Sequence, residues 1–136
     1  MGWALTLETT TSRLTLPRWT AADVFSLQEK LEEAELHLSS AKGELLAFSM
    51  LPKTLTVNDD SGRLARVQDL YRTFDELFAA VAEAHKELSL LHQVKNMLDE
   101  DRVRFYCESS DTYYIKLPEE GLVEVSQSVF EQYNIG

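Results

Sequence analysis

One long apolar periodicity constrains the fold of this chain more than any other feature of its sequence. Residues 63–98 contain no proline or glycine, and their apolar residues recur at alternating intervals of three and four. This spacing places them on one stripe of an α-helix, typical of a helix that packs lengthwise against another helix. We therefore predict a helix over 63–98. The residues of the stripe are Val67, Leu70, Phe74, Leu77, Val81, Ala84, Leu88 and Leu91.

A second stretch with the same periodicity precedes the first and predicts the partner helix over residues 20–50. Thr20 is a good N-cap, and Asp23 three residues later completes a motif that resembles a capping box. Pro52 ends the helix, because proline cannot continue it. The stripe of this helix consists of Val24, Leu27, Leu31, Ala34, Leu38, Ala41, Leu45 and Phe48.

The segment between the two helices, residues 51–62, is rich in turn-forming residues at its end, from Asn58 to Gly62. Asp60 and Ser61 are candidate caps for the following helix. A connection of this length normally joins antiparallel neighbours, so we predict a helical hairpin.

The two ends of the chain alternate polar and apolar residues, as half-buried β-strands do. Residues 1–19 predict a β-hairpin with a loop longer than two residues, because its turn lacks glycine and asparagine. Residues 99–136 predict three strands, at 103–107, 112–117 and 122–125, followed by a short helix with Ser128 as its N-cap. A lone hairpin is marginal in water, so the strands of both ends must find partners.

These expectations combine into one α+β domain covering residues 1–136. Its predicted architecture is a long, coiled-coil-like antiparallel helical hairpin, with a small antiparallel β-sheet at its base that the N- and C-terminal strands form together. A chain of this length is large enough to bury a core and fold unaided.

The charge of the chain suggests what it can bind. The formal net charge is −10, which disfavours direct nucleic-acid binding because that requires clustered basic residues. We read the acidic residues as a solvated surface or, alternatively, as a surface for a basic partner. The candidate residues are Glu29, Glu32, Glu33, Glu35, Asp99, Glu100 and Asp101.

A second apolar row lies beside the main stripe of the helix over 63–98. Leu64, Tyr71 and Phe78 repeat every seven residues, and His85 and His92 continue the row. The apolar face is thus wider than one partner helix requires. We predict a self-association surface that makes the chain a homo-oligomer, the alternative being that the terminal strands cover the row.

Chemical motifs are scarce. The spacing of His85 and His92 does not match a metal pair, and Cys107 in an alternating strand is expected to be a buried structural residue, since Arg104 lies on the opposite face. We expect no enzymatic activity, no cofactor and no bound metal.

No apolar run approaches the roughly 20 residues that span a bilayer, so we expect no membrane contact and a cytoplasmic location. Residues 113–133 resemble a strand–turn–strand–helix segment found in small proteins of phages and mobile elements, which carries no function here.

The function predicted from the sequence is a non-enzymatic protein–protein interaction module. It would be an adaptor, assembly factor or structural component that acts through its helical hairpin and acidic surface on partners with a basic or helical surface. The alternative is an acidic inhibitor of a nucleic-acid-binding protein, of the DNA-mimicking kind that phages encode.

Overall fold

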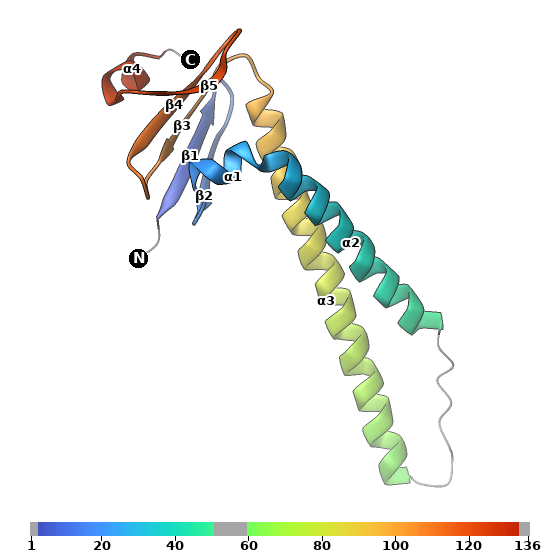
Figure 1. Cartoon of the computed structure of the whole chain (residues 1–136). Helices are drawn as coiled ribbons and strands as arrows, with labels where there is room; N and C mark the ends of the chain where they lie inside the picture. The colour runs from blue at the N-terminus through green and yellow to red at the C-terminus, as the bar shows by residue number, and fades with distance from the viewer. Residues whose placement is uncertain (1–2, 51–59, 134–136) are drawn as a thin grey trace. The chain divides into compact units, whose positions relative to one another are not determined.

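The structure of the chain is a computed structural model that describes the backbone of residues 3–50 and 60–133. Side chains are described for residues 3–50 and 66–133. These ranges combine two long helices with a five-stranded antiparallel sheet, so the chain mixes helix and strand (Figure 1). The expectation of a small sheet was wrong in extent, because all five strands join one sheet. The chain divides into two compact units, residues 1–30 with 91–136 and residues 31–90.

The sheet belongs to the first unit and has the strand order β2-β1-β3-β4-β5. Strand β1 connects the chain's two ends, because it pairs with β2 on one side and with β3 on the other. Leu7 therefore lies opposite both Leu14 and Phe105. The strands are β1 (Ala4–Thr9), β2 (Arg13–Pro17), β3 (Val103–Cys107), β4 (Thr112–Leu117) and β5 (Gly121–Val125).

One face of the sheet carries most of the core of this unit. Helix α1 (Ala21–Phe25) lies on it, and Phe25 meets the ring of Tyr114 edge-on at 5.8 Å, so we call it the α1 face. Tyr114 in turn stacks on Phe105, the largest fully buried side chain, at 4.6 Å. Burying each large apolar side chain stabilises the unit by about 1.5–3 kcal/mol. The buried strand residues of this face are Leu5, Leu7, Leu16, Val103, Phe105 and Cys107.

The opposite face is covered in part by the short helix α4 (Gln127–Gln132), and we call it the α4 face. Phe130 contacts the ring of Tyr113 at 5.0 Å, and Ile115 on the same face is buried. The N-cap of α4 is Ser126, whose hydroxyl accepts a hydrogen bond from the Val129 amide, so the predicted cap at Ser128 was wrong. Ser126 and Ser128 are both serines near the start of α4, and local preference alone does not show which of them caps the helix.

The predicted capping motif at Thr20 is confirmed, but the helix that follows is interrupted. The Thr20 amide donates to the carboxylate of Asp23 at 2.7 Å. Helix α1 then stops at Ser26, and α2 (Leu27–Met50) begins immediately after it. The Ser26 hydroxyl donates to the Ala22 carbonyl at 2.8 Å. Serine bonded to the carbonyl four residues earlier bends helices, which explains why one predicted helix over 20–50 became two.

Helix α3 (Asp60–Leu98) is the longest element, and a lysine from the sheet caps its C-terminus. The Lys116 ammonium donates to the carbonyls of Leu98 and Glu100 at 2.8 and 2.7 Å. A cation at this position satisfies carbonyls that have no partner within the helix and complements the helix dipole. The acidic residues after the helix are thus compatible with its end, which falls before Asp99 as predicted.

We expect Lys116→Met to destabilise the protein by about 2 kcal/mol, because two carbonyl groups lose a charged donor. Chemical denaturation followed by circular dichroism would measure the loss. Lys95→Met is the matched control, since this exposed lysine lies in the last turn of the same helix. Equal stabilities of the two variants would contradict the capping role of Lys116.

The second unit consists of parts of α2 and α3, which run in opposite directions side by side (Figure 1). Its most buried residues are those predicted for the helix stripes, among them Leu31, Ala34, Leu38, Ala41 and Ala84. His37 of α2 lies 3.9 Å from the carboxylate of Glu87 of α3, which links the two helices at the surface.

The connection predicted at residues 51–62 is only partly described. Residues 51–59 lie outside the described ranges, and Asp60, Ser61 and Gly62 belong to α3 rather than preceding it. The helix therefore begins three residues earlier than position 63, at residues that the sequence assigned to a turn by local preference.

Candidate functional site: an exposed aromatic row

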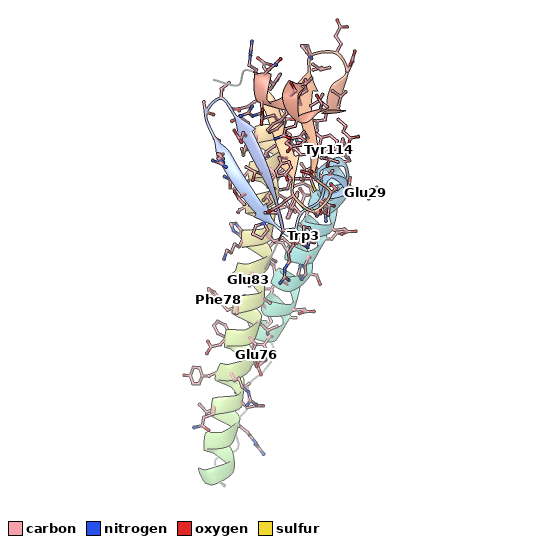
Figure 2. The ribbon with its side chains drawn as sticks, turned by 90° about the vertical axis from the view of Figure 1, so that its left-hand side faces the viewer. Trp3, Glu29, Glu76, Phe78, Glu83 and Tyr114 are labelled. Carbon is pink, nitrogen blue, oxygen red and sulfur yellow. The ribbon has the colours of Figure 1, made fainter. Side chains whose placement is uncertain are left out.

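Three aromatic side chains lie exposed on one side of α3. Tyr71 is 69 % exposed, Phe78 59 % and Phe74 41 %. The rings of Phe74 and Phe78 stack on each other with their centroids 6.2 Å apart. Figure 2 shows Phe78 on the side of α3 that faces away from α2. We call Tyr71, Phe74 and Phe78 the aromatic row.

The exposure of Tyr71 and Phe78 shows that neither ring packs between α2 and α3. Core aromatic residues would be buried, whereas these two are among the most exposed large apolar residues of the described chain. Neither ring belongs to the buried core of the second unit. The third predicted member, Leu64, lies among residues whose side chains are not described, and His85 and His92 are exposed.

Phe74 was predicted as part of the stripe that packs on α2, and its exposure corrects that expectation. The contact between His37 and Glu87 fixes the level at which the antiparallel helices meet. Counting equal numbers of residues along both helices from this contact brings Met50, the last residue of α2, level with Phe74. The stripe of α3 thus reaches the last residue of α2 at Phe74.

The predicted acidic surface is distributed over both units. The four glutamates of α2 that were predicted to belong to this surface are all exposed, with Glu29 in the first unit and the others in the second. Their side chains point away from the buried stripe of α2, as its periodicity requires. These residues are Glu29, Glu32, Glu33 and Glu35.

The remaining acidic candidates lie directly after α3 and line a pocket together with Thr10 and Arg102. Asp99 and Asp101 are exposed, whereas Glu100 is half-buried and accepts a hydrogen bond from the Thr11 hydroxyl at 3.4 Å. The second carboxylate oxygen of Glu100 is buried and has no hydrogen-bond partner among the described residues. The segment thus joins the end of α3 to the loop between β1 and β2.

The reactive residue types are used in structural contacts. Cys107 is fully buried on the α1 face, and Arg104 lies on the other face, as predicted. Burial raises the pKa of the Cys107 thiol, but hydrogen bonds from Ser109 and Ser110 outweigh it, so the pKa is lowered overall. His37 of α2 contacts Glu87 of α3 at the surface. In the parts of the chain that the structure describes, no group of three or more His, Cys, Asp or Glu side chains could hold a metal ion.

Two polar clusters on the α4 face were not anticipated from the sequence. Arg104 contacts Glu8 at 3.3 Å, lies over the Phe130 ring at 4.6 Å, and donates to the carbonyls of Phe130 and Tyr133 at the end of α4. Arg104 therefore fastens α4 to the sheet. Strand alternation identified its face, but nothing local in the sequence connects it to a helix 26 residues later.

The second cluster is centred on Tyr106, whose hydroxyl donates to Asp111 at 2.9 Å and whose ring stacks on Tyr113 at 4.7 Å. The hydrogen bond to Asp111 raises the pKa of Tyr106 to about 12. The phenol thus donates a hydrogen bond within the turn that joins β3 to β4.

Comparison with known proteins gave no match to a family model, a curated protein or a solved structure. Within the described residues, neither long helix is apolar enough over a sufficient length to cross a membrane.

Proposed function

We propose that the chain is a non-enzymatic protein–protein interaction module, an adaptor, assembly factor or structural component. Its antiparallel helical hairpin forms a coiled-coil-like stem, and the aromatic row on α3 binds a helix of a partner protein. The observation that supports this most directly is the exposure of Tyr71, Phe74 and Phe78 side by side on one helix.

Aromatic residues are suited to such a role. Tyrosine and phenylalanine bring large apolar area with few rotatable bonds, and aromatic side chains are enriched in the fully buried centres of protein interfaces. A helix that docks on another helix contacts it through residues three and four positions apart, which is the spacing of Tyr71, Phe74 and Phe78. The row therefore forms a continuous contact stripe on which a second helix can pack.

The test is a pull-down with the full chain as bait, comparing the wild type with a Tyr71→Glu/Phe78→Glu variant. We expect the variant to remain folded by circular dichroism, because both residues are exposed. Capture of partner proteins should fall about tenfold or more, since aromatic interface residues commonly contribute 2 kcal/mol or more to binding.

A second variant serves as the matched control. Leu36→Glu/Leu46→Glu replaces two exposed leucines of α2 with the same charged residue, at 72 % and 61 % exposure. This control should capture the same proteins as the wild type. Equal capture by all three chains would refute the aromatic row as a binding surface.

The exposed glutamates of α2 support the alternative, an acidic inhibitor that occupies the nucleic-acid-binding site of its target. This alternative predicts that capture depends on Glu32, Glu33 and Glu35 and not on the aromatic row. Changing these three residues to glutamine should then abolish capture, and the captured protein should dissociate steeply as salt rises.

A further inference from the structure

We propose that the partner of the aromatic row is a second copy of this chain, with the two α3 helices packed antiparallel about a two-fold axis between Phe74 and Asp75. This inference rests on the proposed function and specifies the partner of the same surface. The geometry of α3 and the charges beside the row carry it.

The first step is the placement of residues around the helix. Successive residues of an α-helix are separated by about 100°. Tyr71 and Phe78 therefore lie almost in line, Phe74 lies on one side of them, and Arg72 and Asp75 lie on the other. The row is thus bordered by the stripe that faces α2 on one side and by a basic and an acidic residue on the other.

The second step is the match of the row with its own copy. A two-fold axis between Phe74 and Asp75 places Tyr71 opposite Phe78 of the second copy, and Phe78 opposite Tyr71 of the second copy. The two Phe74 rings meet beside the axis. All three exposed aromatic residues of each chain are covered by the same three residues of the other, as a self-complementary two-fold interface requires.

The third step is the charge. Antiparallel helices bring the same edge of each copy together, so Arg72 of one copy lies on the same side of the interface as Asp75 of the other. With a rise of 1.5 Å per residue, the two lie about 3 Å apart along the helix axis. A basic and an acidic residue therefore face each other twice. A parallel pair in register would instead place this edge of one copy against the opposite edge of the other, so Arg72 and Asp75 of the two copies would not meet.

Arg72 is able to make this contact because its present partner is local and exposed. It bonds to Asp69 three residues earlier on the same helix, with both side chains mostly exposed. Exposed ion pairs of this kind are weak. The guanidinium can therefore turn toward the second copy without leaving a buried charge behind.

Complementary charge reversal tests the contact between chains. Arg72→Asp leaves two acidic residues at this edge, and Asp75→Arg leaves two basic ones. Each variant alone should self-associate roughly tenfold more weakly than the wild type. An equimolar mixture should recover association, because the heterodimer pairs every acidic residue with a basic one. Light scattering would measure all three samples, and a mixture no better than the separate variants would overturn the proposal.

Cysteine cross-linking tests the direction of the helices. Asp75→Cys lies next to the proposed axis, so mild oxidation should link two copies. His85→Cys lies ten residues further along α3, in line with the row, and should remain unlinked in an antiparallel pair, whereas a parallel pair in register would link it. The wild-type chain controls for Cys107, which is fully buried. Cross-linking of His85→Cys, or of neither variant, would refute the antiparallel arrangement.

The two proposals fail separately. A wild-type chain that stays monomeric up to about 1 mM, where even weak complexes form, would overturn self-association. Row-dependent capture of a different protein in the pull-down would still support the aromatic row as a binding surface.

Discussion

Replacing Leu38 with aspartate is expected to separate the paired segments of α2 and α3 and lower the free energy of unfolding by about 4 kcal/mol or more. Leu38 is 8 % exposed and belongs to the buried stripe of α2. Leu38 lies among apolar residues of this stripe, and burying a charge there is among the costliest single changes. Loss of helical circular dichroism at a lower temperature than in the wild type would measure the effect.

The chain provides a close control for this substitution. Leu36 lies two residues away on the same helix, has the same chemistry, and is 72 % exposed. Leu36→Asp should change stability by no more than about 0.5 kcal/mol, as is usual for surface substitutions. If Leu38→Asp and Leu36→Asp unfolded at the same temperature, the buried stripe of α2 would not stabilise the fold.

The second large effect is expected in the sheet. Phe105→Ala should cost about 3–5 kcal/mol, because it removes a fully buried aromatic ring and leaves a cavity. The substitution also removes the stacking partner of Tyr114. Urea denaturation followed by the fluorescence of Trp3 and Trp19, which both lie in the first unit, would report the loss.

Phe25→Ala is the control for Phe105→Ala. Phe25 contacts the same Tyr114 ring from the other side, but edge-on at 5.8 Å, and it is 57 % exposed. We expect a loss of about 1 kcal/mol, the contribution of an exposed aromatic pair. A larger loss for Phe25→Ala than for Phe105→Ala would contradict the assignment of Phe105 as the centre of the core.

The unexpected contacts of this fold share one property, which is a large separation along the chain. Lys116 reaches the end of α3 from the fourth strand, and Arg104 reaches the end of α4 from the third. Both cap a helix C-terminus with a cation from the sheet. A search of the sequence for lysine or arginine in the last helical turn finds only Lys95 in α3 and none in α4. Local capping rules therefore miss contacts that strand register creates.

For the aromatic row, sequence periodicity predicted the positions of Tyr71 and Phe78 but not the exposure of Phe74. The seven-residue repeat identified Tyr71 and Phe78 as a row separate from the main stripe, because helical geometry alone fixes their common direction. Phe74 fits the main stripe by the same geometry. Its exposure depends on how α3 packs against another segment of the chain, which the spacing of its own residues does not show.

The sequence by itself determined the elements and their buried sides. The three–four spacing specified two long helices, and alternation specified five strands, because both periods follow from backbone geometry that adjacent residues share. Only the tertiary structure decided the strand order, the break at Ser26, the capping of the α3 C-terminus by Lys116 and the exposure of Phe74. Each of these depends on residues far apart in the chain or on competition between near-equal local conformations, and neither leaves a periodic signal in the sequence.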